Sequence, residues 1–295
     1  MAEDRCLGQS AIGIAKTCNL DPESRPDWRL DADRSQLAFF IDQFEKPQSQ
    51  LVEVTNGKGK DQRSLTYLAT EQEPNRYHND LNSRDTLVTE LNVLADFKPV
   101  VPAQAQNAPF LMLGNLSPEV QLSVIQQMQQ RPQLIAMDTM NFWMDIALDS
   151  LKETLKHIDV LIINDEEARQ LSGLYSLRKA AKIIREMGPS ILIIKKGEHG
   201  ALLFHESNIF YAPALPLEEV FDPTGAGDTF AGGFMGYLAA ADRIDFDNMK
   251  RAIIAGSALA SFCVEKFGTQ RLKEVTHAEL QARMQEFVSL STFQL

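Results

Sequence analysis

One run of small and acidic residues stands out in this sequence as a place for chemistry. It reads Gly225-Ala226-Gly227-Asp228, follows an Asp-Pro-Thr turn and leads into a helical run over 229–241. Small residues let backbone N–H groups approach a ligand closely, and the first N–H groups of a helix have no partner within the helix. Together with the helix dipole they make a site for an anion such as phosphate.

Asp228 is the carboxylate in that run. A carboxylate beside a phosphate site is costly unless it has a role, and taking the proton from a hydroxyl that attacks the phosphate is such a role. The alternative is that Asp228 only favours the first turn of a helix. A dinucleotide-binding fingerprint is excluded, because Gly-x-Gly-x-x-Gly needs glycine where Phe230 stands.

The elements around this run predict an α/β fold. Short apolar strands alternate with amphipathic helices from residue 108 onward, which is typical of a mainly parallel sheet covered on both faces. The expected strands are 109–113, 133–137, 160–163 and 191–194, with shorter β runs at 201–204 and 209–211. One helix is expected to start at Ser117-Pro118-Glu119. Further helices are expected over 150–157, 166–171, 176–187, 249–264 and 276–289.

Polar or small residues come directly after several of these strands. Ligands bind beyond the carboxyl ends of the strands in such sheets, so these residues are expected near residues 225–228. They are Asn115, Asp138, Asn141, Asn164 and Gly197.

Asn164 and Glu167 have the spacing of a capping box, which would explain both residues without any function. The small-residue run AGSALASFCV allows either close helix packing or room for a flat base. The polar stretch from Tyr77 to Thr86 suits a sugar, whose hydroxyls need several hydrogen-bonding partners, but a solvated loop is the alternative.

Composition excludes some classes of function. A net charge of −11 argues against nonspecific nucleic-acid binding. No apolar run is long enough for a membrane span, and the start MAEDRC does not have the form of a secretory signal. Three cysteines without metal or CxxC spacing indicate a reducing compartment, so a cytoplasmic protein is expected, with Cys263 packed in the core.

The string over 222–234 resembles the C-terminal signature of the PfkB, or ribokinase-like, carbohydrate kinases. The resemblance runs from about Tyr77 to the C-terminus. It rests on the segments NSRDTLVTELNVLADFKP, GNLSPE, DTMNFW, LIINDEEARQLSG, IKKGEHGALLF, DPTGAGDTFAGGF and ASFCVEKFG.

This resemblance implies a three-layer α/β sandwich with a mainly parallel sheet and a small β lid, through which many members form dimers. It implies division into an atypical segment 1–50, a lid or substrate-side region 51–100 and a core 101–295. The implied reaction is transfer of the γ-phosphoryl group of ATP, with Mg²⁺, to a hydroxyl of a sugar or polyol.

The resemblance also implies roles for single residues. Asp228 would be the general base, and Gly225, Ala226 and Gly227 would stabilise the transferred group. Asn164 and Glu167 would organise water around Mg²⁺, and Asp222 matches a position that binds a monovalent cation, such as K⁺, in some members. Residues expected near the nucleotide are Lys195, Gly197, Gly200, Ser261 and Gly268, and those expected near the substrate are Asn82, Arg84 and Asn115.

Three departures from the family pattern are visible. The segment DTMNFW resembles the family's Asp-x-Asn…Trp region, but the spacing from Asp138 to Asn141 is one residue longer than the usual form. Lys195 stands where a hydroxyl residue is common in the family. Lys195 or the neighbouring Lys196 could reach a phosphate as a point charge. Residues 1–60 lack the first apolar strand with its Asp and the Gly-Gly element near the substrate. Two alternatives to a sugar kinase therefore stay open. One is a nucleoside kinase of the same superfamily, and the other is a nucleotide-binding protein without sugar kinase activity.

Overall fold

A six-stranded sheet forms the centre of the molecule. The computed structural model describes residues 75–77, 84–86, 91 and 97–292, so the expectations for 1–50 and for Asn82 lie outside the described residues. The strands run in the order of the chain: β3 (Phe110–Leu113), β4 (Leu134–Asp138), β5 (Val160–Asn164), β6 (Ile191–Lys195), β7 (Ala201–His205) and β8 (Asn208–Ala212).

The first four of these strands are mutually parallel, whereas β7 and β8 are antiparallel additions at one edge. The predicted α/β class with a mainly parallel sheet is therefore confirmed. Three strands extend beyond the expected ends to include the polar residues Asp138, Asn164 and Lys195. Asn164 and Lys195 are register partners in the β5–β6 pair, so strand pairing itself places them side by side.

Side chains on alternate strand positions enter two separate hydrophobic cores. Ile163 and Ile194 belong to the core on one face, and Ile162 and Ile193 to the core on the other. Because both faces are buried, the strands are apolar throughout rather than alternating.

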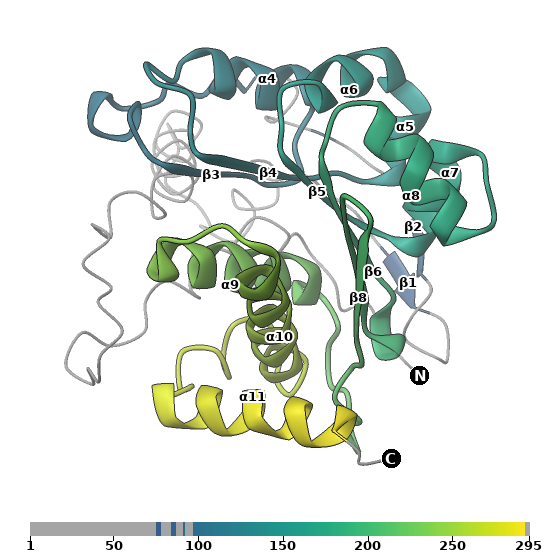
Figure 1. Cartoon of the computed structure of the whole chain (residues 1–295), viewed down its shortest axis with the longest axis vertical. Helices are drawn as coiled ribbons and strands as arrows, with labels where there is room; N and C mark the ends of the chain where they lie inside the picture. The colour runs from purple at the N-terminus through teal and green to yellow at the C-terminus, as the bar shows by residue number, and fades with distance from the viewer. Residues whose placement is uncertain (1–74, 78–83, 87–90, 92–96, 293–295) are drawn as a thin grey trace, which may run out of the picture.

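Helices cover both faces of the sheet (Figure 1). One layer holds α4 (Pro118–Gln126), α5 (Asn141–Ile146), α6 (Leu148–Leu155), α7 (Asp165–Ser172) and α8 (Leu177–Glu186). On the other face lie α9 (Ala226–Ala241) and α10 (Phe246–Cys263), against which α11 (His277–Ser291) packs. Short 3₁₀ turns are η2 (Ala103–Ala105) and η3 (Gly197–His199). The helix α5 was not predicted, because it is only six residues long.

Local sequence signals explain where these helices begin. Ser117 caps α4, since its hydroxyl accepts from Val120 N at 3.3 Å, and Pro118 takes the first helical position. The start of α9 differs from the expectation: the helix begins at Ala226 rather than near Thr229. Gly225 is its N-cap with φ of 83°, a conformation that glycine adopts without strain.

The small-residue run in α10 packs closely against α9. A Cβ on Gly256 would lie 2.6 Å from the carbonyl oxygen of Phe230, and one on Gly233 would lie 2.8 Å from the Gly256 Cα. Of the two expectations for this run, close helix packing is confirmed at these glycines. Cys263, near the end of α10, is buried as expected.

A separate two-stranded antiparallel sheet pairs β1 (Asn75–Tyr77) with β2 (Arg84–Thr86). It lies within the region expected to form a lid, and that role stays a prediction. In the described part of the chain, no helix has both the length and the hydropathy needed to span a membrane.

Candidate active site

The ends of two parallel strands and the start of α9 meet at Lys195. Its Nζ lies 3.4 Å from Asp138 Oδ2, at the end of β4. A Cβ added to Gly227 would lie 2.9 Å from the same Nζ. The ammonium of Lys195 therefore sits against the first turn of α9, beside the residues that the sequence predicts to hold phosphate.

Three buried carboxylates surround this ammonium. Asp138, Glu167 and Asp228 are each less than one-tenth exposed. Burial alone would lower the pKa of Lys195, but attraction to Asp138, Glu167 and Asp228 outweighs it and raises the pKa above its ordinary value. Lys195 is therefore a charged ammonium at neutral pH, among carboxylates contributed by β4, α7 and α9.

Asp138 is fixed in place by its own backbone and by Gln121. Its Oδ1 accepts from Thr139 N at 2.9 Å. The fully buried Gln121 donates from Nε2 to Gly114 O at 2.7 Å and to Asp138 O at 2.9 Å, which ties the ends of β3 and β4 together. Sequence reasoning missed Gln121. A buried polar residue on a helix can be predicted only once it is known which face of the helix packs against the sheet.

Asn164 and Glu167 form the predicted capping box. Glu167 N donates to Asn164 Oδ1 at 2.8 Å, and Asn164 N donates to Glu167 Oε2 at 2.7 Å. The box fixes the Glu167 carboxylate at the end of β5, close enough to influence Lys195. Within the described residues, no group of three or more His, Cys, Asp or Glu side chains is arranged to hold a metal ion directly.

Asp222 has one carboxylate oxygen that hydrogen bonds leave unused. Its Oδ1 accepts from Thr224 N at 3.0 Å, while Oδ2 is buried without a hydrogen-bond partner among the residues that the structure describes. Such an oxygen is costly to bury unless something binds it. Burial raises the pKa of the Cys263 thiol, and the carboxylates of Asp222 and Asp228 raise it further, which puts both acids near one side chain.

Asn115 and Asn141, the predicted asparagines after β3 and β4, make no hydrogen bond to Lys195 within the described residues. Asn115 accepts from Trp143 Nε1 at 3.0 Å and donates to Met140 Sδ at 2.9 Å, so its amide is held by the segment after β4. Asn141 is exposed at the start of α5. The structure thus brings Asp138, but not Asn141, to the ammonium.

The predicted nucleotide-side residues lie at the end of β6 and directly after it, and in the last turn of α10 and after it. Gly200 has φ of 83°, and a Cβ there would lie 2.0 Å from Ala212 O, so the fold itself requires glycine. Gly197 begins η3 with φ of 53°. Ser261 donates to Ala258 O at 2.7 Å and accepts from Arg283 at 2.9 Å, so its hydroxyl joins α10 to α11. The carbonyl of Gly268 lies 3.9 Å from Cys263 Sγ.

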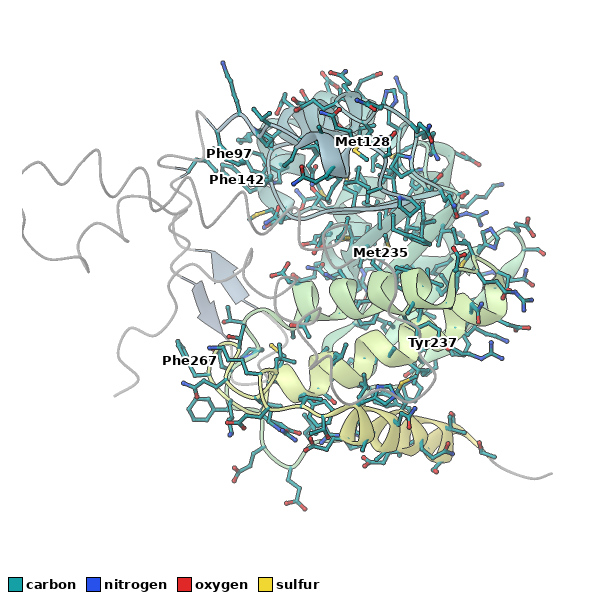
Figure 2. All side chains as sticks on the ribbon, turned by 90° about the vertical axis from the view of Figure 1, so that its left-hand side faces the viewer. Phe97, Met128, Phe142, Met235, Tyr237 and Phe267 are labelled. Carbon is teal, nitrogen blue, oxygen red and sulfur yellow. The ribbon has the colours of Figure 1, made fainter. Side chains whose placement is uncertain are left out.

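The predicted substrate side is described less fully than the phosphate side. Arg84 lies on β2, for which the structure describes the backbone pairing with Tyr77. Figure 2 shows β1 and β2 on the side of the molecule where Phe142 and Phe267 are labelled. Those two residues follow β4 and α10 in the chain.

A comparison with family models gives one match, to the pfkB family carbohydrate kinases over residues 60–276. The match covers most of the 295 residues. It begins somewhat before Tyr77, where the recognisable motifs begin, and it includes all the charged residues around Lys195.

Curated relatives are similar over part of their length. The cytidine kinase of Thermococcus kodakarensis is 30% identical over 140 residues, which is 46% of this chain and 49% of the relative. The aminoimidazole riboside kinase of Salmonella typhimurium is 35% identical over 106 residues, 36% of this chain and 33% of the relative. The chain thus spans half or less of the length of these relatives.

Solved structures share the fold. The nucleoside kinase of Burkholderia thailandensis in complex with inosine has a TM-score of 0.55 at 21% identity, covering 74% of this chain and 70% of that one. The fructokinase of Vibrio cholerae has a TM-score of 0.54 at 19% identity, with 68% of each chain covered. By the extent of the family match, the chain belongs to the PfkB family of carbohydrate kinases.

Proposed function

We propose that this protein transfers the γ-phosphoryl group of ATP to a hydroxyl of a sugar or a sugar-like alcohol. One observation carries the proposal: the buried carboxylate of Asp228 lies in the first turn of α9, where the ammonium of Lys195 is also held. A base and positive charge at a helix N-terminus are what proton removal and phosphate binding require.

Asp228 takes the proton from the attacking hydroxyl. Backbone N–H groups of Gly225, Gly227 and Asp228 stabilise the charge that develops on the transferred group. Their position at the start of a sixteen-residue helix adds the positive end of the helix dipole. The N–H of Ala226, the fourth residue of the predicted set, donates to Pro223 O at 3.2 Å and would have to give up that bond to contribute.

The acidic residues fit a nucleotide that arrives with a divalent cation. One ammonium does not balance the carboxylates of Asp138, Glu167 and Asp228, and a cation would offset the excess negative charge. Magnesium keeps several waters, so it needs no direct cage of protein ligands. Asn164 and Glu167 would hold it through water, and when bound it would neutralise charge on the phosphates.

The remaining predicted residues complete the proposal. The unused Oδ2 of Asp222 supports a site for a monovalent cation such as K⁺. Lys195, Gly197, Gly200, Ser261 and Gly268 are proposed to lie around the nucleotide, and Asn82, Arg84 and Asn115 around the acceptor. A homodimer formed through the β1–β2 region stays a prediction.

The ribose of a nucleoside is a second candidate acceptor. This candidate is favoured by the relatives that are named as cytidine kinase and nucleoside kinase, the latter from Methanothermobacter thermautotrophicus. Both acceptors need the same catalytic groups, so the site around Asp228 does not distinguish them.

A panel of acceptors tests the proposed function. Purified protein is incubated with ATP and Mg²⁺ and, separately, with sugars, nucleosides and inositols, and products are identified by mass spectrometry. We expect one acceptor class to gain a phosphoryl group. A product confined to nucleosides would favour the second candidate, and ATP binding without any product would mean a nucleotide-binding protein that lacks kinase activity.

A further inference from the structure

The ammonium of Lys195 lies at the positive end of a helix dipole, where the carboxylates around it hold it in place. Its Nζ lies against Gly227, in the first turn of α9. The N-terminus of a helix carries partial positive charge, which repels an ammonium. The ammonium and the first N–H groups of α9 are therefore two neighbouring positive groups that a single phosphoryl group can contact together.

The tether that holds this ammonium is loose. The distance from Lys195 Nζ to Asp138 Oδ2 is 3.4 Å, longer than the roughly 2.7–2.9 Å of a strong charge-assisted hydrogen bond. An ammonium has three N–H donors, so one long contact leaves it capacity to bind an anion. Asp138 orients the side chain without saturating it.

A lysine that only balances buried carboxylates would be expected to be enclosed by them. The Lys195 side chain instead remains 19% exposed, while Asp138 is 8% exposed at its side chain. The carboxylates thus do not fully enclose the Lys195 side chain. Glu167 and Asp228 attract it from α7 and α9, so neutral residues could not hold it there equally well.

We propose that Lys195 is a catalytic residue of this chain: its ammonium contacts the phosphoryl group in transfer, and Asp138 is the residue that positions it. This proposal rests on the proposed function. In the reaction, the bond from the γ-phosphorus to the bridging oxygen of ADP breaks, and a bond to the acceptor oxygen forms. The acceptor proton goes to Asp228, while Lys195 stays protonated throughout and contributes charge only.

Nucleotide binding tests the contact without needing an acceptor. Affinities for Mg²⁺ with AMP-PNP, a non-hydrolysable triphosphate, and for Mg²⁺ with ADP are measured by calorimetry. In Lys195→Met we expect a loss of about 10- to 100-fold in affinity for the triphosphate, the worth of a hydrogen bond to a charged group. The affinity for ADP should change less than about threefold, because ADP lacks the group that Lys195 contacts.

Three further variants sharpen this test. Lys179→Met removes a lysine from the exposed face of α8 and should change neither affinity. Lys195→Arg keeps the charge and should keep the preference for the triphosphate. Should Lys195→Met fail to fold in a thermal melt, Lys195→Gln serves in its place with the same expectation. Equal losses for both nucleotides, or no loss, would overturn the contact.

The positioning role of Asp138 has its own readout. Asp138→Asn should lower kcat and weaken the binding of ATP by less than Lys195→Met does, because the ammonium is still present but no longer held in position. Asp138→Glu should recover part of kcat by restoring the carboxylate. An increase in KM with unchanged kcat would contradict the positioning role.

Failure of the proposal and failure of the proposed function are distinguishable. If the wild type phosphorylates no acceptor but Lys195→Met loses triphosphate affinity selectively, the kinase function fails and the role of Lys195 in transfer fails with it. If the wild type is an active kinase and Lys195→Met keeps both kcat and the affinity ratio, only the proposal for Lys195 is wrong.

Discussion

At the scale of single residues, the lack of a side chain at Gly227 determines where the Lys195 ammonium can lie. A side chain at 227 would press on the Lys195 ammonium, which is the far end of a flexible side chain and can move aside. Glycine at this position therefore matters for the location of the charge more than for the stability of the fold.

Gly227→Ala should accordingly impair the reaction while leaving the protein folded. Displacement of a catalytic group by about 1 Å can cost about 100-fold in rate, so we expect kcat to fall by at least about tenfold. The melting temperature should change little, since alanine favours a helix over glycine. Steady-state kinetics and a thermal melt on the same sample measure both quantities.

Gly236→Ala is the matched control on the same helix. A Cβ there meets nothing within 4 Å, so activity should stay at the wild-type level and stability should rise slightly. Equal activity of Gly227→Ala and Gly236→Ala would show that the position of the ammonium does not matter.

The sequence predicted Asp138, Asn164 and Asp228 as candidates, because each follows a strand or opens a helix, and the family resemblance added Lys195. It did not predict that Lys195 pairs with Asp138, since that contact depends on strand order and register across β4, β5 and β6. Nor did it identify Gln121, whose role depends on which face of α4 is buried.

At the scale of elements, close contact with α10 fixes the position of α9, whose first turn carries Asp228. Gly233 and Gly256 let the two helices approach until a Cβ would collide with backbone atoms. Backbone cannot move aside as the end of a lysine side chain can, so substitutions here should act on stability.

Gly256→Ala should destabilise the protein. Its Cβ would lie 2.6 Å from Phe230 O, and overpacking of this kind typically costs about 1–3 kcal/mol. Chemical denaturation measures the change in free energy of unfolding. A variant as stable as Gly236→Ala would mean that α9 and α10 are not packed as described.

The start of α11 predicts a pH dependence of stability. Hydrogen bonds from Arg271, and from the N–H and hydroxyl of Thr276, lower the pKa of Glu279 from its ordinary value of 4.5 to about 2. Because the pKa is lower in the folded state, the carboxylate stabilises the fold above about pH 4.5. That contribution is lost as the pH falls from 4.5 to about 2.

Melting temperatures of wild type and Glu279→Gln, measured from pH 7 down to pH 2, report the contribution of this carboxylate to stability. The wild type should melt higher at pH 7, and the difference should shrink below pH 4.5. Glu286→Gln, on the same helix and 3.9 Å from Arg283, is the control and should show little difference at any pH. A difference for Glu279→Gln that stays constant down to pH 2 would contradict the assigned hydrogen bonds.

Element types were predictable where hydrophobic period and caps agree, as for the apolar strands and the capping box at Asn164. Boundaries were less so: α9 begins at Ala226, because a first turn of small residues carries no apolar signal. As a result, Ala226, Gly227 and Asp228 are helical residues rather than a loop before a helix.

At the scale of the whole molecule, the sheet separates two hydrophobic cores, and Asp138, Asn164 and Lys195 lie at the carboxyl ends of three neighbouring strands. This placement follows from parallel strands, whose carboxyl ends share an edge. The mainly parallel α/β class could therefore be predicted from sequence. Strands β7 and β8 could be expected only as short β runs, because the residue types in a strand do not determine whether it pairs parallel or antiparallel.

The most direct measurement for the central claim compares wild type with Asp228→Asn. Asparagine keeps the size of the side chain but cannot accept a proton as a general base. With the acceptor found by the panel, kcat should fall by about 10²–10⁴-fold while ATP still binds. Asp242→Asn, the same change at the exposed C-terminal end of α9, should leave kcat unchanged. Turnover of Asp228→Asn within about tenfold of the wild type would contradict the assignment of Asp228 as the base.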